Sequence, residues 1–385
     1  MHRKLSAVAL FAVMIMGIAA SALITVYQLP DELTVYGAGS TQLSTLLPVS
    51  VDITDGGDHA SAKIFGVVGV KNVSLHREKP KKVWLAGTLF GLRMYSDGVM
   101  VVGLSDFRSH GARVNPARDC GISRGDVIHA VNGTEVTSNA DFAVKIMNSH
   151  GKVEIEMTES DGSRKNVRLT PAFSDDDGCL KTGMWVRDSA AGIGTLTYID
   201  PESGSFGGLG HGICDADTHD IIPINEGEIF PACVMGIKKG VRGSAGEIRG
   251  YLVEEEIGVL YDNTPYGTFG RYTAVLPGLK AYEAAVKQEI RRGKAQILCT
   301  VTPDGQPRLY DAVIEKINYS GDAARNMIIR ITDDALLEHT GGIIQGMSGS
   351  PIIQNGKFVG AVTHVFVNAP SRGYAIFAEN MLTRP

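Results

Sequence analysis

The segment GMSGSP, residues 346–351, places Ser348 in a glycine-rich turn directly before an apolar run. A serine hydroxyl is a poor nucleophile at neutral pH, so it needs an adjacent base and donors that hold the oxyanion. The glycines let the backbone turn sharply, so that N–H groups of Gly346, Met347 and Ser348 can point at one oxyanion. These conditions make Ser348 a candidate nucleophile for an acyl transfer, and the residues alone leave a simple hairpin corner as the alternative. Ser350 is the lesser candidate because it lies two residues further on.

The proton of such a serine is most often taken by a histidine. His211, in GGLGHGICD, lies among small residues that suit the edge of a cleft, and it precedes Ser348 in the chain. We therefore predict that His211 is the base. His364 is the rival and is interpreted as a residue of the cleft wall, whereas His219 and His339 are weaker candidates.

An aspartate that accepts from the histidine would fix its tautomer and support the imidazolium. Between base and nucleophile, the candidates are Asp333 and Asp334, after the apolar run NMIIRIT, and Asp262 in LYDNTPYG. Asp215 lies too near His211 along the chain to face its ring easily. The residues alone leave this choice open.

Two competing patterns are weaker. The segment HGICDADTHD, residues 211–220, contains residue types that bind zinc, but the sequence has no H-E-x-x-H motif and no second ligand cluster. We interpret it as a polar loop and predict neither a metal nor another cofactor. The segment GISRG, residues 121–125, matches the G-x-S-x-G pattern of α/β-hydrolases, but it leads into a strand rather than a strand-to-helix elbow.

The N-terminus carries a candidate membrane anchor. Arg3 and Lys4 precede an uncharged apolar run from Leu5 to about Leu29. A run of about 20 apolar residues can span a bilayer, and the preceding positive charges favour a cytoplasmic N-terminus. A cleaved signal peptide is the alternative, with ASA at 20–22 as its cleavage site, but its apolar core would be shorter. We predict a retained anchor at 1–29, with the rest of the chain exported.

Composition indicates a β-rich chain of more than one domain. The chain has 385 residues, of which 46 are glycines and 44% are hydrophobic, a balance typical of short strands and tight turns. A net charge of −5, with no basic block beyond KPKK at 79–82, argues against nucleic-acid binding. The five cysteines are scattered without a C-x-x-C motif, so we predict free thiols.

Three regions follow the anchor. Residues 30–80 are predicted to be a juxtamembrane segment. Residues 81–172 resemble a PDZ domain, because GISRGDVIHAVNG precedes a helix in SNADFAVKIMNSHG, with Ser138 as its N-cap, and the alternating strand KVEIEM. Phe90, Gly91 and Leu92 are expected to form its loop for a peptide carboxylate, although the loop lacks a double glycine. After an acidic linker, residues 180–385 are predicted to form a double β-barrel with one helix at 278–293.

The nucleophile segment carries a family resemblance. GMSGSP closely matches the nucleophile turn of chymotrypsin-like serine proteases, and FVGAVTH resembles the strand that lines their substrate cleft. Together with the anchor, the PDZ-like region and GLGHGI, the stretch GGIIQGMSGSPIIQNGKFVGAVTHVFVN resembles the stage IV sporulation protein B family of serine peptidases. The resemblance is tightest across residues 341–368. The expected fold is therefore mainly β, with an anchor helix, a PDZ-like α/β domain and a chymotrypsin-like double barrel.

This resemblance implies roles for individual residues. It makes Ser348 the nucleophile and His211 the base, and it favours Asp333 as the acid. Asp333 lies only 15 residues before Ser348, unlike the usual long separation in chymotrypsin-like enzymes, so Asp262 remains the alternative. Thr363 matches a family position on the strand after the nucleophile and is expected to support the substrate or the triad.

The resemblance also implies a biological role. Members of the family are membrane-tethered and act between the forespore and mother-cell membranes. They cleave themselves and a membrane-bound regulator, which releases an intramembrane protease that activates a late mother-cell sigma factor. The PDZ-like groove would bind the protein's own N-terminal segment or the tail of the substrate. Two alternatives are a catalytically silent PDZ scaffold and a zinc-dependent hydrolase.

Overall fold

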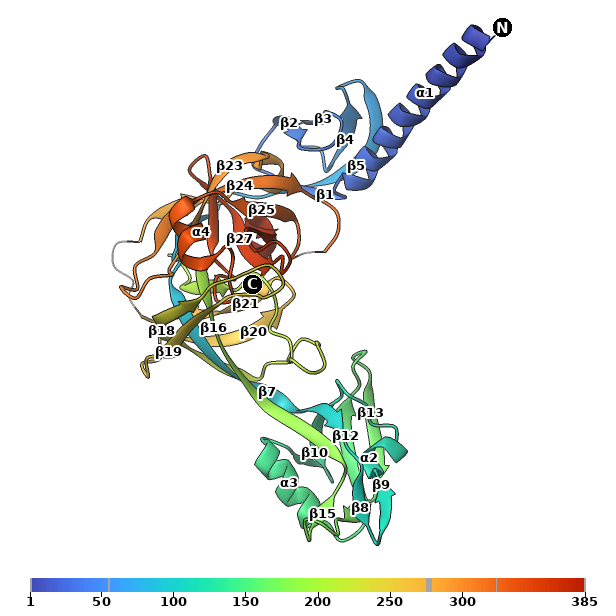
Figure 1. Cartoon of the computed structure of the whole chain (residues 1–385), viewed down its shortest axis with the longest axis vertical. Helices are drawn as coiled ribbons and strands as arrows, with labels where there is room; N and C mark the ends of the chain where they lie inside the picture. Colours follow the sequence, from blue (N-terminus) through green and yellow to red (C-terminus); the bar gives the residue numbers. More distant parts are fainter. Residues whose placement is uncertain (1, 55, 275–278, 323, 384–385) are drawn as a thin grey trace.

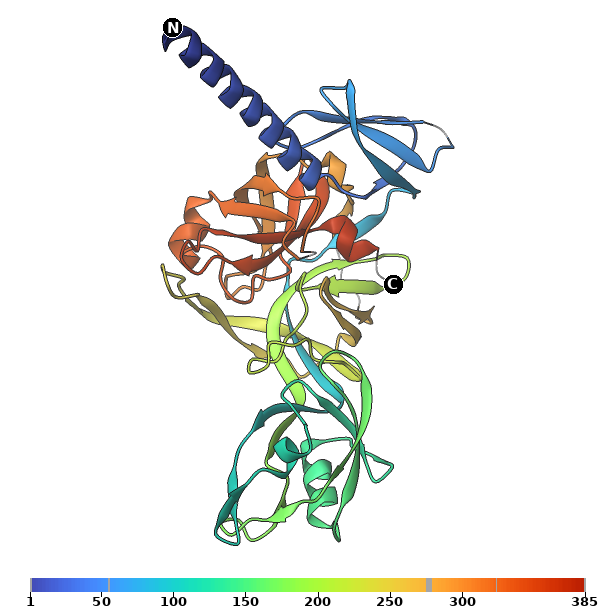
Figure 2. The same ribbon diagram turned by 90° about the vertical axis from the view of Figure 1, so that its right-hand side faces the viewer.

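The computed structural model describes residues 2–54, 56–274, 279–322 and 324–383. Helix α1 (His2–Gln28) projects from one end of an elongated molecule, and a small lobe forms the other end (Figures 1 and 2). Two β-barrels lie between them. This architecture places the anchor candidate and the lobe on opposite sides of the predicted enzyme domain.

The region expected to be a juxtamembrane segment is a folded five-stranded sheet. Its alternating burial, as in β4 and the second half of β5, buries one face of each strand, which is the pattern that a half-buried strand requires. The strand order is β1-β5-β4-β3-β2. The strands are β1 (Glu32–Val35), β2 (Gly39–Leu43), β3 (Val49–Ile53), β4 (His59–Ile64) and β5 (Val68–Arg77).

The first barrel is a ring of six strands. Neighbours pair in the order β7-β18-β20-β21-β17-β16, and a further pairing of β16 with β7 closes the ring. Phe90, Leu92, Phe206 and Leu260 fill its interior and are almost fully buried. The strands are β7 (Leu89–Leu104), β16 (Met184–Ile199), β17 (Ser205–Gly208), β18 (Glu226–Lys238), β20 (Gly258–Thr264) and β21 (Gly267–Tyr272), with β6 (Lys82–Leu85), β19 (Glu247–Leu252) and β22 (Ala281–Glu283) beside them.

The second barrel is closed in the order β23-β24-β25-β28-β27-β26. Its strands are β23 (Gly293–Cys299), β24 (Arg308–Ile317), β25 (Met327–Ile331), β26 (Pro351–Gln354), β27 (Lys357–Val365) and β28 (Arg372–Phe377). The short helices η1 (Lys287–Glu289), α4 (Asp334–Thr340) and α5 (Ala378–Leu382) flank it. The predicted fold, mainly β with a double barrel in the peptidase region, is confirmed.

The distal lobe is inserted between β7 and β16. Both strands have 16 residues and run out of the first barrel into the lobe, where they continue to pair with each other. Ser138 caps the predicted helix by accepting the N–H of Asp141 at 3.1 Å. The lobe contains β8 (Phe107–Ser109), β9 (Ala112–Val114), α2 (Pro116–Asp119), β10 (Val127–Val131), β11 (Thr134–Glu135), α3 (Asn139–Met147), β12 (Val153–Thr158), β13 (Arg164–Leu169), β14 (Ala172–Phe173) and β15 (Leu180–Lys181).

The expected peptide-carboxylate loop is a strand instead. Phe90, Gly91 and Leu92 lie in β7, and their backbones pair with β16 on one side and β18 on the other. Gly91 is required by close packing, because a Cβ there would lie 1.8 Å from a methyl group of Leu252. The prediction of a ligand loop at these residues is therefore wrong, since their hydrogen-bonding groups are used inside the barrel.

The expected helix at 278–293 is also wrong over its described residues. Its sequence has favourable helix formers, but Ala284, Ala285 and Val286 are consecutive and all buried. A surface helix would bury only one face. Tertiary packing against β6 and the second barrel instead produces β22, η1 and the start of β23.

Candidate active site

Ser348 lies in the turn that enters β26, where the second barrel faces the first. Gly346 and Gly349 adopt φ angles of +98° and +94°, which favour glycine. A Cβ at Gly349 would lie 2.1 Å from the carbonyl oxygen of Thr195. The glycines therefore allow both the sharp turn and the close approach of β16 from the other barrel.

Two threonines of β16 hold this turn. Thr195 Oγ1 donates to the carbonyl of Gly346 at 2.8 Å, and the Thr195 N–H donates to the carbonyl of Ser348 at 2.9 Å. Thr197 Oγ1 donates to the carbonyl of Gly349 at 2.7 Å. Sequence reasoning missed both threonines, whose one local signal is the alternation T-L-T in the segment GTLTYI.

The peptide N–H groups of the turn fall into two sets. Met347 donates to the carbonyl of Ile344 at 3.1 Å, and Gly349 donates to Val362 at 2.8 Å. Within the part of the chain that the structure describes, the N–H groups of Gly346 and Ser348 have no hydrogen-bond acceptor. Gly346 and Ser348 thus keep free donors, whereas the donor expected at Met347 is already used.

His211 and Ser348 line the same cavity, which has a volume of about 560 Å³. The cavity wall comes from both barrels, with Leu92 and Ile193 on one side and Ile344 and Thr363 on the other. Such a cleft between barrels can hold an extended peptide across the nucleophile. The structure therefore brings together the two residues that sequence reasoning placed at the centre of the site.

The tautomer of His211 follows from its hydrogen bond. Nδ1 lies 2.8 Å from the carbonyl oxygen of Gly212, which can only accept, so Nδ1 carries the proton. In the neutral ring, Nε2 is then the free base. Burial lowers the pKa of His211 from its usual value, although the bond to Gly212 opposes this shift.

His364 packs against His211, with ring centroids 4.6 Å apart. Burial, together with the nearby His211 and Arg325, lowers the pKa of His364 to about 4. Its buried Nδ1 has no hydrogen-bond partner among the described residues. Both imidazoles are therefore neutral at neutral pH.

The hydroxyl of Ser348 is hydrogen-bonded to the cleft wall. It donates to the carbonyl oxygen of Thr363 at 2.7 Å, and Thr363 Oγ1 in turn donates to the carbonyl of Ala324 at 2.8 Å. Ser350, the lesser candidate, is fully buried, and its Oγ lies 3.5 Å from Thr195 Oγ1. Of the two serines, Ser348 is the one that reaches the cavity.

The structure does not bring Asp333 or Asp262 to His211. Asp333 caps α4, with one carboxylate oxygen accepting the N–H of Leu336 at 3.0 Å and the other that of Asp311 at 3.3 Å. No hydrogen bond or ion pair in the described ranges joins Asp333 or Asp262 to the histidine, because Asp333 is held at the helix and Asp262 lies outside the cavity wall.

Neighbouring polar residues position the loop that carries His211. The buried amide of Asn263 accepts the N–H of Ile213 at 2.8 Å and donates to the carbonyls of Ile213 and Ile222, both at 2.9 Å. Asp215, considered above as a triad or zinc residue, accepts the N–H groups of Asp217 and Thr218 at 2.9 Å.

Arg187 ties the same loop to β16. Its guanidinium pairs with the fully buried carboxylate of Asp215 and with Asp217 at 3.1 Å. The carboxylate of Asp215 is therefore occupied by hydrogen bonds within the loop and by this ion pair. The His211 loop is fixed from both sides, by Asn263 of β20 and by Arg187 of β16.

Two barrels with a serine turn and a neutral histidine in the cleft between them have the architecture of a serine peptidase. Residues 178–382 match the family SpoIVB peptidase S55, and this match covers more than half of the chain. The protein belongs to this family of serine peptidases. No curated protein matches the chain. The match begins after β7, so the family region alone does not include every strand of the first barrel.

Proposed function

We propose that the chain is a sporulation serine endopeptidase in which Ser348 is the nucleophile and His211 is the general base. The observation that carries this proposal is that both residues line one cleft beside the free N–H groups of Gly346 and Ser348. These two N–H groups form the proposed oxyanion hole. Thr363 and His364 complete the cleft wall.

The proposed reaction begins with a rotation of the Ser348 side chain away from the Thr363 carbonyl. Nε2 of His211 then takes the hydroxyl proton while Oγ attacks the scissile peptide carbonyl. The tetrahedral oxyanion is held by two N–H groups, and His211 returns the proton to the leaving amine. Water repeats the sequence and releases the acyl group from Ser348.

The Gly212 carbonyl holds the His211 tautomer in this arrangement. A carbonyl is a weaker partner for an imidazolium than a carboxylate, because it carries only a partial charge. We propose that Asp333 contributes through position. It caps the N-terminus of α4, and the C-cap residue of this helix, Gly341, leads into the nucleophile segment.

The test uses the full chain in detergent, its Ser348→Ala variant and a fluorophosphonate probe. Mass spectrometry should find the probe on Ser348 and self-cleavage only in the parent protein. Cleavage retained in the variant would remove Ser348 from the mechanism. A folded but unlabelled parent would favour the silent scaffold, and loss of cleavage in a metal chelator would favour the zinc-dependent hydrolase.

We place this activity at a membrane between forespore and mother cell. An N-terminal apolar helix supports the attachment to a membrane, because Leu10–Gln28 is long enough to cross a bilayer and has a mean hydropathy of 2.2, whereas the location between the two cells follows from the family resemblance. The proposed substrates are the protein itself and a membrane-bound regulator of an intramembrane protease. Cleavage of that regulator would lead to activation of a late sigma factor.

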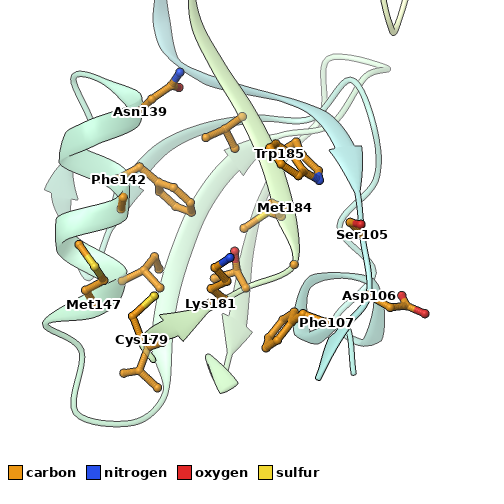
Figure 3. Close-up of a pocket in the computed structure, with 16 residues that line it drawn as sticks. Ser105, Asp106, Phe107, Asn139, Phe142, Met147, Cys179, Lys181, Met184 and Trp185 are labelled. Carbon is orange, nitrogen blue, oxygen red and sulfur yellow. The ribbon is translucent and has the colours of Figure 1, made fainter. Parts of the chain in front are cut away.

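We propose that the distal lobe is a PDZ-like peptide-binding module. A cavity of about 360 Å³ lies between α3 and the first residues of β16 (Figure 3). Phe142 and Met147 of α3 face Met184 and Trp185 across it. Its proposed ligands are the protein's own N-terminal segment and the tail of the substrate. Peptides of both kinds should change the fluorescence of Trp185, which is 66% exposed.

A further inference from the structure

The turn between β4 and β5 exposes a group of large apolar side chains. Phe65, Val67 and Val68 are 64%, 81% and 58% exposed. Leu46, in the loop between β2 and β3, is 54% exposed. Clustered apolar side chains on a surface mark contacts with a partner or a membrane, whereas isolated ones need no explanation.

The backbone conformation of this turn disfavours a phenylalanine at position 65. Phe65 has a φ of +53°, a conformation that is uncommon for a bulky residue and that Asn or Gly adopts at lower cost. Its side chain points into solvent and contributes little to the core. A strained, exposed phenylalanine therefore points to a contact outside the folded chain.

Hydrogen bonds place this turn beside the last turn of α1. The N–H of Phe65 donates to the carbonyl of Pro48 at 2.9 Å. Leu47 directly precedes Pro48, and its N–H donates to Thr25 Oγ1 of α1 at 3.2 Å. Thr25 is fully buried, so this part of the helix is built into the sheet. Figures 1 and 2 show the small sheet beside the end of α1 in both views.

Further contacts make the helix, the sheet and the second barrel one connected unit. Lys71 of β5 donates to the carbonyl of Leu29, just after α1, at 2.7 Å. On the barrel side, Gln288 donates to the carbonyl of Thr34 at 2.6 Å. The position of the turn relative to the helix is therefore set by the fold and does not depend on a flexible linker.

The candidate membrane span ends at Gln28, three residues after Thr25. At 1.5 Å per residue, Thr25 lies only about 5 Å inside that end. The apolar turn is thus near the level at which the helix leaves the hydrocarbon. Tyr27, 84% exposed at the same level, is the type of residue enriched at membrane interfaces.

We propose that the Phe65–Val68 turn inserts into the bilayer that α1 spans, on the exported side, with Leu46 and Tyr27 beside it. This inference rests on the proposed membrane anchoring of α1. The consequence is a fixed orientation of the enzyme on the membrane. Because the sheet is bonded to the second barrel, the catalytic cleft is held at a set height and favours substrates whose cleavage site lies at that height.

The experiment measures tryptophan quenching by lipids with brominated acyl chains. The full chain is reconstituted in vesicles of phosphatidylethanolamine and phosphatidylglycerol as F65W or V67W. I18W, within α1, tests whether the anchor helix lies in the bilayer. M235W, at a position 69% exposed on β18, is the matched control for an exposed apolar residue away from the turn. The native Trp84 and Trp185 give the same background in every variant.

We expect brominated lipid to quench F65W and V67W, with I18W also quenched and M235W unchanged. Quenching of I18W alone would overturn the insertion of the turn while leaving the anchor intact. If I18W is not quenched, the anchoring on which the inference rests fails. Equal quenching of M235W would show a nonspecific association and would also overturn it. Thermal unfolding of each variant reports its fold, and probe labelling of Ser348 tests the peptidase proposal separately.

Discussion

At the scale of single residues, the nucleophile turn depends on a hydroxyl from the other barrel. Thr195 is fully buried, and its Oγ1 fixes the carbonyl of Gly346, whose own N–H is a proposed oxyanion donor. We expect Thr195→Val to lower stability by about 1–2 kcal/mol, because the carbonyl loses a buried partner. Peptidase activity should fall by roughly 10- to 100-fold, less than the loss of a whole oxyanion donor. Thermal unfolding and rates of peptide cleavage measure both effects.

Thr268→Val is the matched control for this substitution. Thr268 is also fully buried in the first barrel, but its Oγ1 has no partner among the described residues. Replacing it with valine removes an unsatisfied hydroxyl, so stability should stay the same or rise. Equal losses in the two variants would show that replacing a buried hydroxyl with a methyl group, and not the loss of the bond to Gly346, lowers the stability.

The pH dependence should report His211. A protonated imidazole cannot accept the Ser348 proton, so activity is lost as pH falls through the pKa of His211. Burial holds that pKa below its usual value of 6.5, so the acid limb of the kcat/KM profile should lie below pH 6.5. The limb should persist in His364→Asn, because the already low pKa of His364 leaves it neutral there. A limb above pH 6.5 would contradict the assignment.

Local sequence could indicate Ser348 and His211 as candidates that the structure brings to one cleft, because glycines next to a reactive residue are a short-range signal. It could not predict Thr195, which meets Gly346 across 151 residues of chain. It also could not separate a catalytic aspartate from a helix cap. Asp333 has the position of an N-cap in the structure, and the same residue type serves both purposes.

At the scale of elements, an ion pair joins β16 to the His211 loop. Asp215→Asn would leave Arg187 without its buried charge partner. We expect a loss of about 2–4 kcal/mol, below the value for a fully buried pair because Arg187 keeps partial access to water. Activity should fall as well, since the loop carries the base. Thermal unfolding and peptide cleavage by the same preparation measure the two losses.

Asp217→Asn is the control for that variant. Asp217 pairs with the same arginine, but its side chain is 54% exposed. An exposed pair contributes about 1 kcal/mol or less, so its loss should be small. If both variants lose the same stability, the buried carboxylate has no special part in holding the loop.

Two elements show where sequence patterns fail. Apolar runs correctly indicated strands. Nothing in the local segment LFGLRMY, however, indicates that it pairs on both sides with strands from residues 184–199 and 226–238. The segment AYEAAVKQE has good helix formers, yet its packing against β6 and the second barrel decides otherwise. Both errors come from long-range pairing that overrides local preference.

At the scale of the whole molecule, the distal lobe is an insertion into the peptidase fold. The ring of the first barrel needs β7, which begins at residue 89, although the family match begins at 178. A deletion of 81–172, the predicted PDZ boundaries, would remove β6 and all of β7. We expect that deletion to be insoluble, because it leaves β18 and β16 without their shared partner.

The register of β7 and β16 offers a better boundary. Tyr95 lies opposite Ser189, so an Asn-Gly turn that replaces residues 96–188 can close a hairpin between them. We expect this shortened variant to unfold cooperatively and to react with the fluorophosphonate probe at Ser348, because both barrels remain closed. Labelling should be slower than in the parent, since Arg187 and its hold on Asp215 are lost. An unfolded product would mean that the barrels need the lobe, and an unchanged rate would mean that the ion pair does not position His211.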